Sequence, residues 1–257
     1  MVTNMYGLGT IVNIIAILIG GLIGLTFGRI LTERVQNALI MACGISTVII
    51  GLGGAMEKML VPEEGGLVTA GSMMLIASLV GGVLIGELLR VEDRMDQFGE
   101  WLKKKTGNER EAGFVNAFVT ASLTVCVGGM AVVGPIEDGI YGNHTVLYTK
   151  AILDFVIIII MSASLGKGCI FSALSVGLVQ GLITLLARLI EPLMTESALS
   201  NLSFVGSVLI FCVGINLVLG VWFPPDPDSG SEPVRVRVGN LLPGIVIAVA
   251  WAFLPFG

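Results

Sequence analysis

Five ionisable side chains gather in one short stretch of this chain, between two apolar segments. The stretch runs from residue 134 to 154, reads GPIEDGIYGNHTVLYTKAILD, and holds a glutamate, two aspartates, a histidine and a lysine. Its Lys150 and Asp154 are four positions apart, so a helix would place them on one face as an ion pair. Such a carboxylate can bind a cation or a proton, and such a lysine can hold an anionic group of a solute. The spacing indicates a binding site, although the same pair could instead only hold two helices together.

Two further carboxylates precede this pair. If the Lys150–Asp154 pair lies in a solute pathway, Glu137 and Asp138 would make the outer entrance of that pathway negative and raise the local concentration of cations. In the alternative interpretation, the sequence EDG only shapes a turn before the next helix. His144 is the only histidine of the chain, and its place near the surface predicts a solvated loop residue.

The composition is that of a multi-pass membrane protein. Of 257 residues, 54% are hydrophobic and 13% are charged, whereas a soluble domain carries about 25% charged residues. The mean hydropathy is +0.93. The net charge of -5 lies in loops, and no basic surface of the kind that binds nucleic acid is expected. The cysteines stand singly in apolar stretches, so neither a disulfide framework nor a metal site is expected; they are Cys43, Cys126, Cys169 and Cys212.

Eight apolar runs are long enough to cross a bilayer, which takes about 20 residues each. The fold class predicted from them is an all-α bundle of about eight transmembrane helices. The expected spans are Gly9–Gly28, Ala38–Met56, Leu67–Leu89, Phe114–Pro135, Val146–Leu165, Cys169–Ile190, Phe204–Phe223 and Leu241–Phe256.

The lysines and arginines predict the orientation of these spans, because cytoplasmic loops retain them. With eight spans, one side of the membrane receives 11 of the 14 basic residues, and the other side receives only Lys58, Lys150 and Arg188. Both termini are therefore expected on the outer side of the membrane.

Other polar side chains are set into the spans at helical spacing. Thr124 belongs to a stripe on the fourth span that also holds Asn116, Thr120 and Gly128, and GGMAVVGP then predicts a helix that unwinds. On the sixth span, Gln180, Thr184 and Arg188 form one row. These rows would face the Lys150–Asp154 pair from neighbouring helices.

The chain also contains an internal similarity at an offset of 160 to 163 residues. Gly21 then corresponds to Gly181, Glu33 to Glu196, and Gly51 to Gly214. Spans one to three would repeat as spans six to eight in the opposite direction, the inverted symmetry common among secondary transporters. The expected organisation is a single integral membrane domain, 1–257, with repeats at 9–89 and 169–257, an amphipathic cytoplasmic segment at 90–111, and central spans with a broken helix at 112–168.

Small residues four positions apart line single faces of several spans. Ala16, Gly20, Gly24 and Gly28 form such a face on the first span, and Gly177 and Gly181 lie on one on the sixth. Such faces let two helices approach closely, either within one protomer or across a homodimer interface. In the segment 90–111, apolar residues recur at helical spacing, so it is expected to pack under the bundle or to lie on the lipid surface.

Three stretches resemble a known bacterial family. GTIVNIIAILIGGLIG (9–24), GPIEDGIYGNHTVLYTKAILD (134–154) and SALSVGLVQGLIT (172–184) are similar to signature stretches of the integral membrane family called domain of unknown function 554. The resemblance spans nearly the whole chain and implies a transporter of the bacterial inner membrane. The residues that it marks for binding are Asn13, Glu137, Asp138, Lys150, Asp154, Gln180 and Thr184. Ala151 departs from the serine expected there.

The function expected from these features is transport of a small hydrophilic solute or ion, with its site among spans four to six. An ion channel and a membrane sensor or scaffold without transport remain as alternatives. An enzyme is not expected, because the sequence offers no nucleophile with a base, no metal-ligand cluster and no phosphate loop. No cofactor is expected; the expected partners are the lipid bilayer, the solute or ion, and a second copy of the chain.

The orientation can be tested by labelling a single cysteine. We expect a cysteine that replaces Ser231, in a background without the native cysteines, to react with a membrane-impermeant maleimide only after the cytoplasmic side is opened. Labelling from the periplasmic side alone would overturn the assignment.

Overall fold

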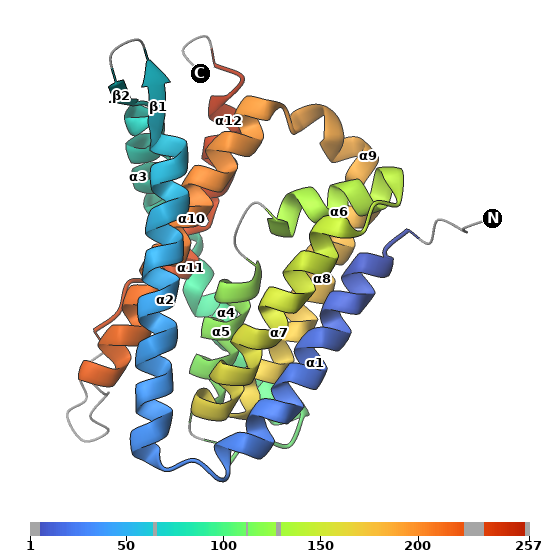
Figure 1. Cartoon of the computed structure of the whole chain (residues 1–257), viewed down its shortest axis with the longest axis vertical. Coiled ribbons are helices and arrows are strands. Elements are labelled where there is room, and N and C mark those ends of the chain that lie inside the picture. The colour runs from blue at the N-terminus through green and yellow to red at the C-terminus, as the bar shows by residue number, and fades with distance from the viewer. Residues whose placement is uncertain (1–5, 64–65, 112, 127–129, 224–233, 255–257) are drawn as a thin grey trace. The chain divides into compact units, whose positions relative to one another are not determined.

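The computed structural model describes residues 6–63, 66–111, 113–126, 130–223 and 234–254, and these residues are predominantly helical (Figure 1). The α-helices are α1 (Leu8–Gly28), α2 (Glu33–Met59), α3 (Ser72–Leu89), α4 (Val91–Lys105), α5 (Phe114–Cys126), α6 (Met130–Tyr141), α7 (Thr145–Leu165), α8 (Ser172–Leu185), α9 (Ala187–Ile190), α10 (Glu196–Trp222), α11 (Val238–Leu241) and α12 (Pro243–Trp251). Two 3-10 helices, η1 (Lys167–Phe171) and η2 (Glu191–Leu193), and two strands, β1 (Leu60–Glu63) and β2 (Gly66–Thr69), complete the described elements.

The predicted all-α membrane bundle is confirmed. Among the described residues, six helical segments are long and apolar enough to cross a bilayer: α1, α2, α3, α7, η1 with α8, and α10. The helices α5 and α6 would together make a seventh, bent span, and Val238–Trp251 is a shorter apolar helix. Each expected span therefore has a helical counterpart, but the last one is too short to cross unaided.

The largest difference from the expected spans is a small antiparallel hairpin. Strand β1 pairs with β2 in the register Leu60↔Thr69 and Val61↔Val68. The third span was expected to begin at Leu67, which lies in β2, and the helix begins only at Ser72. The apolar residues of β2 continue the hydrophobic run of the helix, so hydropathy alone does not separate the two elements.

The fourth span is broken, as the glycine pair and proline predict. Helix α5 ends at Cys126, α6 begins at Met130, and the two helices are bent by 61°. Of the stretch GGMAVVGP (128–135) that was expected to unwind, residues 128–129 lie outside the described residues and residues 130–135 belong to α6. The expected end of the span at Pro135 is wrong, because α6 continues through Pro135 to Tyr141 and places the EDG sequence inside a helix.

The described chain divides into two compact units that alternate along the sequence. The first unit comprises residues 1–32 and 95–195, and the second comprises 33–94 and 196–257. In the first unit, α1 lies along α7 and also packs against α8, while α6 packs against α7, α8 and α9. In the second unit, α2 lies along α10, and α3 packs against α12.

Glycines allow a close contact between α1 and α7 in the first unit. A Cβ atom on Gly20 would lie 2.8 Å from the carbonyl oxygen of Phe155, and one on Gly24 would lie 2.3 Å from that of Ile159. A Cβ on Gly28 would lie 2.5 Å from the carbonyl oxygen of Ala163. The small-residue face predicted on the first span is therefore used inside the protomer, against α7. The homodimer remains a prediction.

Glycines also allow a close contact between α2 and α10 in the second unit. A Cβ on Gly51 of α2 would lie 2.4 Å from the backbone nitrogen of Phe211 on α10. On the opposite helix, a Cβ on Gly214 would lie 2.6 Å from the backbone nitrogen of Val48. Close approach of this kind gives van der Waals packing between helices where lipid supplies no hydrophobic drive.

The amphipathic segment is the helix α4, and its residues from Met95 onward belong to the first unit. Leu102 is buried, and the ring of Phe98 lies 5.8 Å from that of Phe118, so one side of this helix packs on α5. Trp101 is 54% exposed and stacks on Phe98. The helix therefore packs against the protein, as one of the two expectations has it, and presents an aromatic ring outward.

In each unit, basic residues of the loops pair with glutamates that lie close to the ends of the spans. In the second unit, Arg235 pairs with Glu92 of α4, and Arg237 pairs with Glu87 at the end of α3. In the first unit, Lys167, directly after α7, pairs with Glu111, close before α5. Within each unit, this arrangement agrees with the basic loops that the sequence assigned to one side of the membrane.

The helix contact at Gly51 predicts that two neighbouring glycines of α2 differ in how well they tolerate a larger side chain. We expect Gly51→Ala to lower the free energy of unfolding of the purified protein by about 1–3 kcal/mol, because the new methyl group meets backbone atoms that cannot rotate away. The matched control is Gly53→Ala, where a Cβ would meet no atom within 4 Å. Equal thermal unfolding midpoints for the two variants in detergent would contradict this packing.

Candidate functional site

An ion pair is buried in the first unit. Lys150 Nζ donates to both carboxylate oxygens of Asp154, at 2.9 Å to Oδ1 and 2.7 Å to Oδ2. Both residues lie on α7, one turn apart, as the four-residue spacing predicts, and both are buried. In an apolar setting each charge alone would be costly, so the two depend on one another.

Two neutral amides from other helices complete the cluster around this pair. Asn13 on α1 donates from Nδ2 to Asp154 Oδ2 at 3.0 Å, and the same Nδ2 lies 3.4 Å from Gln180 Oε1 on α8. Asn13 and Gln180 are both fully buried. The polar cluster, as we name Asn13, Lys150, Asp154 and Gln180, thus joins α1, α7 and α8 at one point inside the unit.

The polar cluster is not saturated. Among the described residues, Asn13 Oδ1 and Gln180 Nε2 are buried without a hydrogen-bond partner. The hydroxyl oxygens of Thr10 and Thr184 share this property. Buried polar atoms are nearly always paired, and exceptions often have a functional reason. The cluster therefore retains both a donor and an acceptor with which a small polar solute or ion could bind.

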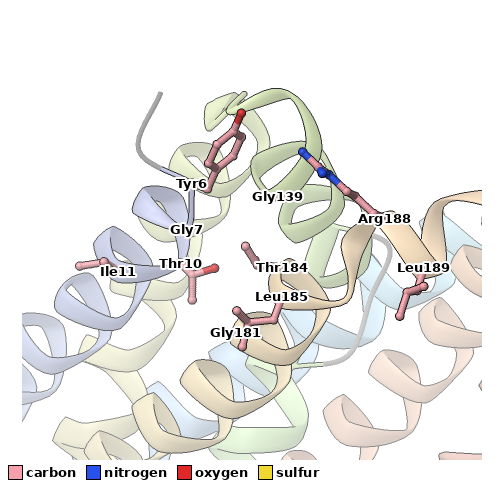
Figure 2. Close-up of a pocket in the computed structure, with 10 residues that line it drawn as sticks. All are labelled: Tyr6, Gly7, Thr10, Ile11, Gly139, Gly181, Thr184, Leu185, Arg188 and Leu189. Atoms are coloured by element: carbon pink, nitrogen blue, oxygen red, sulfur yellow. The ribbon is translucent and has the colours of Figure 1, made fainter. Parts of the chain in front are cut away.

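A pocket lies next to this cluster, at the end of the first unit where α1 begins (Figure 2). Its volume is about 460 Å³, within the usual range for small-molecule sites. Its lining comes from α1 and the residues before it, from α6, and from the stretch α8–α9: Tyr6, Gly7, Thr10, Ile11, Gly139, Gly181, Thr184, Leu185, Arg188 and Leu189.

Helix geometry connects the pocket to the polar cluster. Thr10 precedes Asn13 by three positions on α1, and Thr184 follows Gln180 by four positions on α8. Residues three and four positions apart are neighbours on one helix face. Two rows of polar side chains therefore lead from the pocket lining into the polar cluster, one to Asn13, which bonds to Asp154, and one to Gln180, which bonds to Asn13. The row of Gln180, Thr184 and Arg188 expected on the sixth span includes the second of these.

Asp138 has a different place from the one expected. It is fully buried in α6, where it accepts hydrogen bonds from the backbone nitrogens of Gly7 at 2.9 Å and Gly9 at 3.1 Å. A carboxylate at this position caps the beginning of α1 and complements the positive end of its dipole. Gly7 has φ = 84°, a conformation that favours glycine.

Asp138 also bonds to the imidazole of His144, whose Nδ1 lies 2.9 Å from Oδ1. The side chain of His144 is only 17% exposed. The expectation of a freely solvated loop residue is therefore wrong, because the carboxylate draws the ring into the unit. Asp138 and His144 together fasten α6 and the beginning of α7 to the beginning of α1.

The remaining expected residues lie outside the polar cluster. Glu137 accepts a hydrogen bond from Asn143 at 3.0 Å, and Thr124 donates to the carbonyl oxygen of Thr120 in its own helix. Of the expected site residues, the structure brings together Asn13, Lys150, Asp154 and Gln180, with Thr184 in the adjoining pocket. A binding role for Glu137, Asp138 and Thr124 stays a prediction.

Sequence reasoning did not assign the rest of the pocket lining to a site. Thr10 could have been found as the polar residue one turn before Asn13. Arg188 was recognised as the last residue of the polar row on the sixth span but was not assigned to a site. Gly181 looked like a packing residue, but a Cβ there would meet no atom within 4 Å. Tyr6 carried no signal. Among the described residues, no group of three or more His, Cys, Asp or Glu side chains is placed to hold a metal ion.

Comparison with known proteins identifies the family of this chain. Residues 8–253 match the model of a family described as "Protein of unknown function (DUF554)". The chain belongs to this family. Its DUF554 relatives include "Uncharacterized membrane protein YdfK" of Bacillus subtilis, 26% identical over 245 residues that cover 95% of this chain and 97% of the relative. Another is "Uncharacterized protein YqgA" of Escherichia coli, 26% identical over 249 residues and 94% of each chain. No solved structure matches the chain.

The buried pair predicts a strong dependence of stability on both partners. We expect Lys150→Met to lower the free energy of unfolding by about 3–5 kcal/mol, because it leaves the Asp154 carboxylate buried without its cation. The double change Lys150→Met with Asp154→Leu should restore most of this loss, since no charge then remains in the cluster. Thermal unfolding in detergent measures both.

The matched control for this prediction is Lys58→Met. Lys58 also pairs with a carboxylate, Glu57, but both partners of that pair are solvent-accessible and it should contribute little. If Lys150→Met is as stable as Lys58→Met, the polar cluster does not hold a charged pair.

Proposed function

We propose that this protein transports a small hydrophilic solute or ion across the bacterial inner membrane, with the polar cluster as its binding site. The observation that carries the proposal is the buried carboxylate of Asp154, held by Lys150 and Asn13 between membrane-length helices. Ionisable residues inside membrane helices are costly and usually mark solute or ion pathways.

The geometry of the cluster suits binding better than simple bracing. The pair lies within one helix, α7, so it does not itself link two helices. Asn13 links it to α1, but among the described residues nothing pairs with its carbonyl oxygen or with the amide nitrogen of Gln180. Residues that only stabilise helix packing gain nothing from unpaired donors and acceptors beside a pocket.

An inverted repeat is part of the proposal, and the helix pairings support it. The repeat makes three pairs of helices equivalent: α1 with α8, α2 with α10, and α3 with α12. The members of each pair pack against one another within a single unit. Two elements exchanged by a twofold axis make reciprocal contacts, so each contact should recur between the equivalent residues.

Reciprocal contacts of this kind exist between α2 and α10. At an offset of 163 positions, Gly51 is equivalent to Gly214 and Gly44 is equivalent to Ser207. A Cβ on Gly51 would lie 2.8 Å from the carbonyl oxygen of Ser207, and one on Gly214 would lie 2.9 Å from that of Gly44. The contacts of Gly51 with Phe211 and of Gly214 with Val48 are related by the same offset.

The same offset recurs at the other two pairs. A Cβ on Gly177 of α8 would lie 3.2 Å from Ile14 of α1, a residue 163 positions away. A Cβ on Gly82 of α3 would lie 2.7 Å from the backbone nitrogen of Gly244, which is 162 positions away. Inverted repeats place their solute site near the repeat interface, and the α1–α8 contact is where Asn13 meets Gln180.

The orientation belongs to this proposal as well. Both termini lie outside, so the pocket near the beginning of α1 opens toward the periplasm and the basic loops face the cytoplasm. A second copy of the chain completes a homodimer. A pathway from the pocket to Asp154 would then carry solute inward from the outer side.

The test is ion flux in reconstituted vesicles. We expect the wild-type protein to pass sodium or protons, measured with radioactive sodium and with a trapped pH-sensitive dye. Asp154→Asn should reduce this flux at least tenfold for the same amount of folded protein, because it removes the carboxylate charge while keeping the shape and the bond from Asn13. The change also leaves Lys150 without its carboxylate, so the amount of folded protein is matched by size-exclusion chromatography before reconstitution. The matched control is Glu109→Gln, an exposed carboxylate outside the helices, which should leave the flux unchanged. Full flux through a folded Asp154→Asn protein would contradict the proposal.

A further inference from the structure

We infer that the pocket of the first unit binds the carboxylate of a small organic acid through Arg188, with the apolar part of that acid against α1 and α8. The inference builds on the proposed function, because it names the class of solute that would enter the transport pathway. It depends on the pocket lining and would stand as a binding property even without transport.

Arg188 supplies a cation that pairs with no described residue. It lines the pocket from α9, and no ion pair joins it to any other residue that the structure describes. The nearest carboxylate along the chain, Glu191, accepts a hydrogen bond from the hydroxyl of Tyr141 at 2.8 Å. A guanidinium offers two parallel donors that match a carboxylate, so an anionic group is the chemistry that this position recognises.

Two hydroxyl groups in the lining add hydrogen-bonding capacity beside this cation. Thr10 is 5% exposed, its hydroxyl has no partner in the described part of the chain, and it lines the pocket together with Thr184, whose hydroxyl is also buried and unpaired. In Figure 2, the oxygen of Thr10 points into the pocket, and Tyr6 and Arg188 stand at its outer end. Hydroxyls that can donate to an anion indicate a polar ligand group in contact with the wall.

The rest of the wall is apolar. Ile11 on α1 and Leu185 and Leu189 on α8 and α9 line the pocket. Gly181 leaves its part of the wall open, because nothing lies within 4 Å of the Cβ position. A purely inorganic anion would leave these side chains without contact, so the lining favours an acid that carries a short hydrocarbon chain or ring.

The experiment uses the full chain in a non-ionic detergent and compares hexanoate with its neutral counterpart, hexanamide, by calorimetric titration. We expect hexanoate to bind at least tenfold more tightly than hexanamide, because only the acid carries a charge for Arg188. Binding in detergent avoids the passive entry of short acids into vesicles.

Three variants assign the binding to the pocket. Arg188→Gln should weaken hexanoate at least tenfold and remove the preference over hexanamide. Thr10→Val should weaken it several-fold, and Gly181→Phe should abolish binding by filling the open wall. The matched control is Arg110→Gln, an exposed arginine away from the pocket, which should bind hexanoate as the wild type does. Arg188 is exposed, so its replacement should not prevent folding.

Other results would overturn the inference. One is that hexanoate does not bind, and another is that it binds equally well to Arg188→Gln. In a third contrary result, phosphatidylglycerol co-purifies with the wild type, is absent from Arg188→Gln and is not displaced by hexanoate. Arg188 would then bind a lipid headgroup. Sodium or proton flux without hexanoate binding would defeat only this inference, whereas hexanoate binding without flux would defeat only the transport function.

Discussion

The buried pair of Lys150 and Asp154 is the constraint on which the first unit depends. Two charges one turn apart on a membrane helix are tolerable only if each neutralises the other and further polar groups surround them. This condition brings Asn13 from α1 and Gln180 from α8 to the same point, across 141 and 167 positions of sequence. The packing of α1, α7 and α8 and the chemistry of the site are thus one arrangement.

Glycine makes this arrangement possible, because it lets backbones approach where side chains would separate them. Along α1, Gly20, Gly24 and Gly28 bring the helix onto the carbonyl groups of α7 and so hold Asn13 at hydrogen-bonding distance from Asp154. The cap that Asp138 gives to the beginning of α1 fixes the same helix from its other end. Gly181 is different, since its missing side chain leaves space in the pocket wall. The same residue type therefore serves packing on one helix and an open wall on another.

The sequence predicted what depends on local periodicity and missed what depends on distant contacts. The apolar run of the first span placed α1 within one residue of its observed start, and the four-residue spacing placed Lys150 beside Asp154. The hairpin was missed because Leu67 and Val68 are as apolar as the helix that follows. Asp138 was expected at an outer mouth, and nothing local to EDG reveals that it caps a helix 129 to 131 positions earlier. The pocket arises from three separate segments of the first unit's sequence, so no spacing within one segment could predict it.

Ion flux through the double variant Lys150→Met with Asp154→Leu tests the central claim most directly, because this variant removes both charges and leaves no buried charge unpaired. If the pair is the binding element, the variant unfolds at close to the wild-type temperature and passes neither sodium nor protons. If the pair only stabilises the fold, the variant is equally stable and keeps full flux, and that result would contradict the account.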